Sequence, residues 1–173
     1  NFAALYAYYL ASPLNWLIML CPKGYVIEFM TYMIVLKTGL AGLTFAWYLS
    51  KHCRTRDFGT AYFAIFYALS GYMAAYSWNI MWLDCILLFP VIMLGLEQLV
   101  KEGKGLLYGI SLGVCILSNY YISIMICMFM VIYFFALWIL ERGRSGRDFV
   151  VSGFKFAGYS VLAGGLSAAV LLP

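Results

Sequence analysis

Long apolar runs separated by short polar blocks fill almost the whole chain. The runs cover 26–50, 59–76, 85–100, 105–118, 122–140 and 149–172. About 20 helical residues cross the hydrocarbon core of a bilayer, which is about 30 Å thick. The runs lack the strict alternation of apolar and polar residues that a transmembrane β-barrel needs. The pattern therefore predicts an all-α, polytopic transmembrane helical bundle of about six spans.

Residues 1–25 precede the first of these runs and are too often interrupted to span a membrane. Pro13 and Pro22 break the segment, which is rich in Tyr. Aromatic side chains with a polar tip suit the membrane–water interface. We expect short interfacial helices here, followed by a transmembrane helical domain over 26–173. Because the chain opens on Asn1 and ends at Pro173 as its last apolar run is finishing, we also expect a piece of a longer protein.

The polar blocks predict which ends of the helices face the cytoplasm. If the chain turns at 118–121, three connections share one face of the bundle. These connections hold eight of the eleven Lys and Arg residues, which are Lys51, Arg54, Arg56, Lys101, Lys104, Arg142, Arg144 and Arg147. Cytoplasmic loops of membrane proteins carry such an excess of positive charge. We expect the basic loops inside the cell, and residues 1–25, the stretch 77–84 and the turn at 118–121 outside.

The composition agrees with a membrane protein and limits the classes of binding partner. Hydrophobic residues make up 65% of the chain and charged residues 10%, against about a quarter charged in soluble domains. The net charge of +4 comes from the basic loops and therefore indicates orientation, with membrane lipid and no nucleic acid as partner. The five cysteines show no CxxC spacing, so we interpret them as small packing residues.

Two of the predicted helices are short for a bilayer. The runs 85–100 and 105–118 correspond to about 24 and 21 Å of helix. Either the bilayer thins around them, or the outer turns lie below the membrane surface. Turns at membrane depth are tolerated only where protein or a water-filled cavity covers them. We infer a recessed cavity that opens outward.

The stretch 77–84, SWNIMWLD, is the most polar feature between two long apolar runs, and it ends in a carboxylate. Asp84 has four readings: a general base, a metal ligand, an acceptor for sugar hydroxyls, or the N-cap of a helix that starts at Cys85. Trp78 and Trp82 stack on sugar rings or belong to the interfacial aromatic belt. Asn79 offers an amide between them.

The turn at 118–121 raises the same choice. Asn119 and Tyr120 either contact a substrate or serve only to turn the chain, since Asn is a common turn residue. Trp78, Asn79, Trp82, Asp84, Asn119 and Tyr120 are therefore the substrate-binding candidates.

Lys37 lies 11 residues into the first span, too deep for its ammonium group to reach either surface easily. A buried ammonium group needs a partner. The sequence offers four candidate partners: Asp84, Glu28, helix carbonyl groups, or the phosphate of a lipid-linked substrate.

Common catalytic motifs are missing from the chain, which has no P-loop, GxSxG or HExxH pattern, and its one histidine, His52, lies in a basic block. We expect neither a self-contained hydrolase nor a metal centre, and no cofactor; a divalent metal ion is not indicated.

Several segments resemble the bacterial YfhO membrane protein family. They are residues 1–15 (NFAALYAYYLASPLN), 69–72 (LSGY), 77–84 (SWNIMWLD) and 118–122 (SNYYI). The resemblance extends over essentially the whole chain. That family is similar to glycosyltransferases of the GT-C fold, polytopic enzymes that use polyprenyl-phosphate sugars on the outer face of the membrane. Members are implicated in glycosylating cell-wall polymers such as lipoteichoic acid in Gram-positive bacteria.

The resemblance implies where the catalytic base lies. In GT-C enzymes the catalytic carboxylate usually follows the first span, in an outer loop of which residues 1–25 would be the remainder. We therefore expect the base upstream of Asn1, with Asp84 as the one candidate inside the chain.

The expected function is transfer of a sugar from a polyprenyl-phosphate donor to an envelope polymer, with Lys37 as the candidate for the lipid phosphate. The alternative is a non-enzymatic transporter or flippase of lipid-linked envelope precursors. A transporter should show discontinuous helices near the midplane, and a transferase a fixed outward cavity.

Overall fold

The computed structural model describes residues 12–140 and 146–168. This part of the chain contains helices and no strand, which confirms the all-α prediction. Two 3₁₀ helices come first and seven α-helices follow: η2 (Pro13–Leu20), η3 (Lys23–Tyr25), α2 (Val26–His52), α3 (Phe58–Ala68), α4 (Gly71–Tyr76), α5 (Ile80–Glu102), α6 (Leu106–Ser118), α7 (Tyr120–Leu140) and α8 (Gly146–Leu166). Residues 1–11, the larger part of the expected interfacial segment, lie outside the described residues.

Four of the described helices, α2, α5, α7 and α8, are long and apolar enough to cross a membrane, and α6 is a shorter apolar helix. The run 59–76, expected as one span, is divided between α3 and α4. Asp57 caps α3 by accepting a hydrogen bond from the Thr60 N–H at 3.1 Å. Ser70, with extended backbone at ψ 157°, separates the two helices just before Gly71. The local polar and glycine residues therefore override the apolar character of this run.

Helix α5 begins at Ile80, five residues before the predicted start. Asn79 occupies the N-cap position, and its carbonyl accepts from the Trp82 N–H at 2.9 Å. Asp84 consequently lies inside the helix, and its interpretation as the N-cap is wrong. At the other end, Gly103 terminates the helix with φ 75°, a left-handed conformation that glycine adopts without strain.

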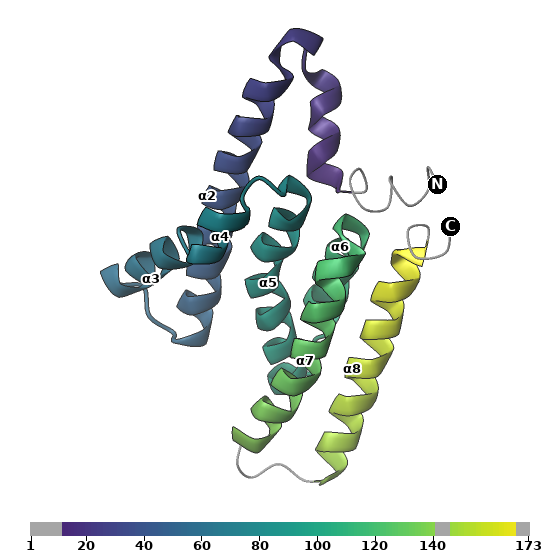
Figure 1. Ribbon diagram of the computed structural model, residues 1–173. Coiled ribbons are helices and arrows are strands. Elements are labelled where there is room, and N and C mark those ends of the chain that lie inside the picture. The colour runs from purple at the N-terminus through teal and green to yellow at the C-terminus, as the bar shows by residue number, and fades with distance from the viewer. Residues whose placement is uncertain (1–11, 141–145, 169–173) are drawn as a thin grey trace.

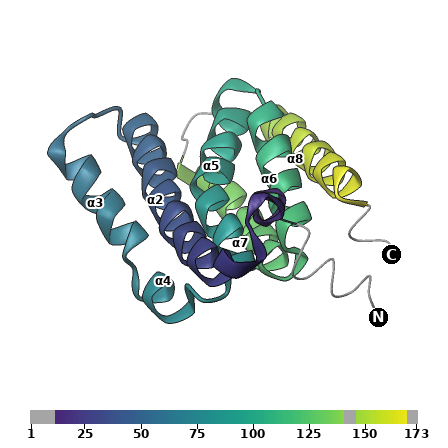
Figure 2. The ribbon, with the colours of Figure 1, turned by 90° about the horizontal axis from the view of Figure 1, so that it is seen from above.

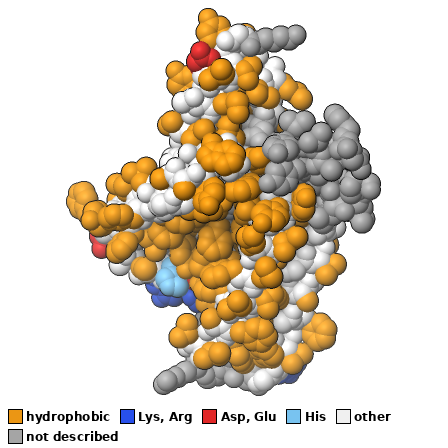
Figure 3. Space-filling view, viewed as in Figure 1, with side chains coloured by type: hydrophobic (Ala, Val, Ile, Leu, Met, Phe, Trp, Pro, Cys, Tyr) orange, Lys and Arg blue, Asp and Glu red, His pale blue; other side chains and the backbone are white. Residues whose placement is uncertain are grey.

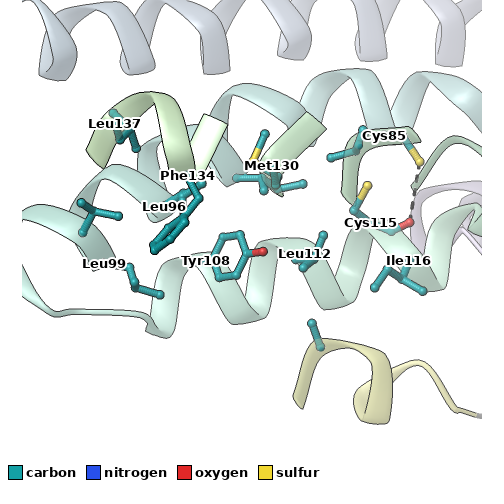
Figure 4. Close-up of a cluster of buried hydrophobic side chains, with 14 of the residues drawn as sticks. Cys85, Leu96, Leu99, Tyr108, Leu112, Cys115, Ile116, Met130, Phe134 and Leu137 are labelled. Atoms are coloured by element: carbon teal, nitrogen blue, oxygen red, sulfur yellow. Dashed lines mark hydrogen bonds between the residues drawn. The ribbon is translucent and has the colours of Figure 1, made fainter. Parts of the chain in front are cut away.

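Helix α5 is the centre of the bundle, because it packs against α2, α6 and α7, while α8 packs mainly on α6 (Figures 1 and 2). The main apolar core lies among α5, α6, α7 and α8, where Leu96, Leu99, Tyr108, Leu112 and Phe134 face one another (Figure 4). A smaller cluster of Ala41, Met73, Leu83 and Leu87 joins α2, α4 and α5.

The two ends of the bundle differ in charge. The α5–α6 connection lies at one end, together with the C-terminal ends of α2 and α7 and the N-terminal end of α8, and the α4–α5 and α6–α7 turns lie at the other (Figure 1). The visible face is mostly apolar, and Lys and Arg side chains are seen only in its lower part (Figure 3). This arrangement fits a membrane protein. That the basic end is cytoplasmic stays a prediction.

Helices α5 and α6 approach so closely that glycine is required at one position. A Cβ atom added to Gly95 would lie 2.5 Å from the Tyr108 nitrogen and 2.7 Å from its Cα. These are backbone atoms, which cannot move without separating the two helices. The contact therefore fixes the distance between the central helix and its neighbour.

We expect Gly95→Ala to lower the free energy of unfolding in detergent micelles by about 1–3 kcal/mol, because the added methyl group overpacks the α5–α6 contact. The matched control is Gly158→Ala in α8, where an added Cβ would meet no atom within 4 Å. That control should be neutral or stabilising, since alanine favours helix. Equal effects of the two substitutions would contradict the close approach.

Candidate functional site

A pocket of about 600 Å³ lies at the end of the bundle opposite the basic connections. Its walls come from η2, from the first part of α2, and from the turn that leads into α5. The lining residues are Asn15, Ile18, Phe29, Met30, Met33, Trp78, Asn79, Ile80, Met81 and Trp82. The walls are therefore largely apolar, with two indoles and two carboxamides.

Directly below the pocket, Lys37 of α2 is completely buried. Its ammonium group donates to the Asp84 carboxylate at 2.8 Å, to the Asn15 side-chain oxygen at 2.6 Å and to the Ile80 carbonyl at 3.1 Å. Among the four partners that the sequence left open, the structure pairs Lys37 with Asp84 and with a helix carbonyl group. Glu28 lies in the first turn of α2 and is exposed. Since an ammonium group has three protons, none remains for a lipid phosphate in this conformation.

Asp84 is also buried, with 2% of its surface exposed. Its Oδ2 atom accepts from Lys37 and from the hydroxyl group of Ser12, which is fully buried as well. Its Oδ1 atom is buried and has no hydrogen-bond partner among the described residues. A charge in such surroundings is tolerated only when it is paired, so the ion pair explains why Asp84 can lie within an apolar helix.

The residues around the mouth of the pocket leave two further polar groups unpaired. Asn79 is 4% exposed, and its side-chain nitrogen has no partner within the described part of the chain; the same holds for the Trp82 indole nitrogen. Trp78 is 69% exposed, and its indole donates to the Ala75 carbonyl. Buried donors without partners are rare in folded proteins. A ligand oxygen or a water molecule at the pocket would satisfy those of Asn79 and Trp82.

Asn119 and Tyr120 are not among the pocket-lining residues. The Asn119 side chain is fully buried and caps α7, since its oxygen accepts from the Ile122 N–H at 3.0 Å. Its backbone is extended, with φ −161°. The structure thus brings Trp78, Asn79 and Trp82 together at one pocket with Asp84 beneath it, and gives Asn119 a capping role.

Ser12 and Asn15 complete the site, although the sequence did not single them out. Both belong to the segment around Pro13, and they contact residues 72 and 22 positions further along the chain. The apolar walls at Phe29, Met30 and Met33 were likewise unassigned, because their positions in α2 match any lipid-facing or core residue. A single sequence carries no signal for these contacts.

A second polar cluster lies towards the other end of α5, around the carboxylate of Glu97. Glu97, 3% exposed, accepts from Tyr133 at 2.6 Å and from Tyr48 at 3.1 Å. It also contacts the His52 ring at 2.7 Å and Lys101 at 3.0 Å. The described residues contain no group of three or more His, Cys, Asp and Glu side chains that could hold a metal ion. We interpret this cluster as a structural connection among α2, α5 and α7.

We expect Lys37→Met to lower the free energy of unfolding by about 3–5 kcal/mol, because it leaves the Asp84 carboxylate buried without its counter-charge. The double variant Lys37→Met/Asp84→Leu should recover most of that loss. Unfolding in mixed detergent micelles measures both. The control is Lys155→Met, which removes an exposed ammonium group that donates to the Gly103 carbonyl at 3.2 Å. A double variant no more stable than the single one would argue against the ion pair.

Comparisons with known proteins place the chain in a family. No curated protein and no solved structure matches it significantly. The family model described as "Bacterial membrane protein YfhO" matches residues 1–173. A match over the full length, together with the apolar helices described above, shows that this chain belongs to the YfhO family of bacterial membrane proteins.

Proposed function

We propose that the chain forms the membrane segment of a glycosyltransferase, which moves a sugar from a polyprenyl-phosphate donor to an envelope polymer such as lipoteichoic acid. The observation that carries the proposal is the pocket itself. It combines two indoles and two carboxamides in apolar walls, and it lies at the end of the bundle away from the basic connections.

The chemistry of the lining suits a lipid-linked sugar. Indole rings stack on the apolar faces of sugar rings, and Trp78 offers a largely exposed ring at the mouth of the pocket. Asn79 offers an unpaired donor for a hydroxyl or phosphate oxygen. The apolar side chains of Phe29, Met30 and Met33 suit a hydrocarbon chain.

The position of the pocket supports a reaction on the outer face. With the basic connections in the cytoplasm, the pocket opens outward. Helix α6 has 13 residues, about 20 Å, against a hydrocarbon core of about 30 Å. The turn at Asn119 would then lie below the outer surface, as a recessed cavity requires.

In the proposed reaction, a hydroxyl oxygen of the acceptor attacks the anomeric carbon of the donor sugar. The bond from that carbon to the phosphate oxygen breaks, and the phosphate leaves with the electron pair. A carboxylate takes the hydroxyl proton. We do not assign that role to Asp84, because both its burial and its pairing with Lys37 keep it from the pocket lining. Lys37 and Asp84 would instead position the pocket walls.

A second candidate function is transport of lipid-linked envelope precursors. The observation in its favour is the break between α3 and α4, since transporters bind their substrates at discontinuous helices. Neither α3 nor α4 contributes a residue to the pocket, however. The break therefore lies away from the pocket, and we prefer the glycosyltransferase proposal because it draws on the lining of the pocket.

We expect Trp78→Leu and Asn79→Leu each to lower kcat/KM for sugar transfer about tenfold, a loss of ~1.4 kcal/mol that matches one stacking or hydrogen-bond contact. The assay follows radiolabelled sugar from a polyprenyl-phosphate donor to lipoteichoic acid, with the full-length protein in lipid vesicles. The matched control is Trp47→Leu, which changes an exposed indole of α2 that does not line the pocket.

Unchanged sugar transfer in both pocket variants would show that the pocket takes no part in the reaction. If the full-length protein transfers sugar from no polyprenyl-phosphate donor but moves a fluorescent lipid-linked precursor across the vesicle membrane, the transport function replaces the proposed one.

A further inference from the structure

The 3₁₀ helix η2 forms one wall of the pocket but is weakly packed. It runs beside the first half of α2 as one arm of a hairpin, joined to α2 through residues 21–25 (Figure 1). None of the residues 13–20 is buried, and Met19 and Leu20 are each 82% exposed. A 3₁₀ helix of eight residues is also unusually long for its poorer hydrogen-bond geometry. The side chains of η2 therefore bury little of their surface.

Two side-chain hydrogen bonds attach the start of this arm, residues 12–15, to the buried ion pair. Ser12 donates to the Asp84 carboxylate, and the Asn15 side-chain oxygen accepts from Lys37 at 2.6 Å. Between them, the half-buried Leu14 packs on the small apolar cluster of α2, α4 and α5. One member of the turn thus contacts the anion of the buried ion pair, and another contacts its cation.

We propose that residues 12–20 are a strap that opens and closes the pocket, and that the Lys37–Asp84 ion pair is its latch. Release of the 12–15 turn lets the arm move away from α2 about the connection at 21–25. This movement uncovers Met33, which lines the pocket and is 4% exposed in the closed arrangement. The inference concerns access to the pocket and holds whichever ligand the pocket takes.

The two latch bonds can be exchanged without breaking the ion pair. When the strap leaves, Asp84 lacks one donor and Lys37 lacks one acceptor, while their mutual contact at 2.8 Å stays intact. Water or a hydroxyl-bearing ligand supplies both a donor and an acceptor. The open state is therefore compatible with a folded bundle, and a ligand that reaches the ion pair favours it.

The latch is tested by substituting residues of the strap and keeping Lys37 and Asp84, so that no charge is left unpaired. In a background in which Cys21, Cys53 and Cys127 are replaced by serine, Met33→Cys reports access to the pocket through its rate of labelling by a membrane-impermeant thiol reagent. Adding Ser12→Ala and Asn15→Leu should raise that rate about tenfold for each bond removed, the factor that corresponds to a hydrogen bond with a charged group.

Three controls separate opening of the strap from loss of the fold. Met19→Ala changes a strap residue that is remote from the latch, and it should leave the labelling of Met33→Cys unchanged. Ile27→Cys, at a side chain 79% exposed, should label equally fast with and without the latch. Met130→Cys, at a fully buried core position, should stay unreactive in every variant.

Amide hydrogen exchange supplies a second measurement in the protein with its natural cysteines. Peptides covering 12–22 should exchange faster in the Ser12→Ala/Asn15→Leu variant, while peptides from α6 and α7 keep their protection. Unchanged labelling of Met33→Cys together with unchanged exchange over 12–22 would overturn the proposal. Equal acceleration over α6 and α7 would overturn it as well, because the two residues would then stabilise the whole bundle.

Discussion

A buried ion pair between Lys37 and Asp84 is the contact on which the candidate site depends. Neither charge reaches water, and each would be very costly alone in apolar surroundings. Both become satisfied only when α2, α5 and the turn at 12–15 meet at one place. The pocket lies directly above that place, so the position of the pocket follows from the need to pair two charges.

The same two helices are joined by polar contacts a second time, towards their other end. Tyr48 of α2 bonds to Glu97 of α5, so 11 residues separate the two contacts along α2 and 13 along α5. Both helices run in the same direction, and α3 and α4 provide the return connection (Figure 1). Two polar contacts at matched separations fix the register of helices whose apolar surfaces could otherwise slide past each other.

Much of the fold could be predicted from the sequence because the signals are local. Apolar runs predicted α2, α6 and α7 to within a few residues, and the depth of Lys37 predicted that it needs a partner. The start of α5 was placed too late, since a carboxylate after a polar stretch is typical of a helix cap. Asp84 is instead the partner of Lys37, which lies 47 residues earlier in the chain. A single sequence does not show that contact.

Only one wall of the pocket at the candidate site could be predicted from the sequence. Trp78, Asn79 and Trp82 stood out as polar or aromatic residues between apolar runs, and they do share a pocket. The opposite wall comes from η2 and α2, whose residues contact the pocket only because the chain folds back over α2. Which segments fold back depends on tertiary packing, and hydrophobic periodicity does not encode it.

The most direct test of this account is a distance measurement in the membrane. Solid-state NMR on protein in lipid bilayers, with ¹⁵N at the lysine Nζ and ¹³C at the aspartate Cγ, detects a direct ammonium–carboxylate contact by dipolar dephasing. We expect one lysine signal to be strongly dephased, and we expect this dephasing to disappear in Asp84→Asn. A Lys37 signal that is not dephased by any aspartate would contradict the ion pair, and with it the arrangement of the pocket.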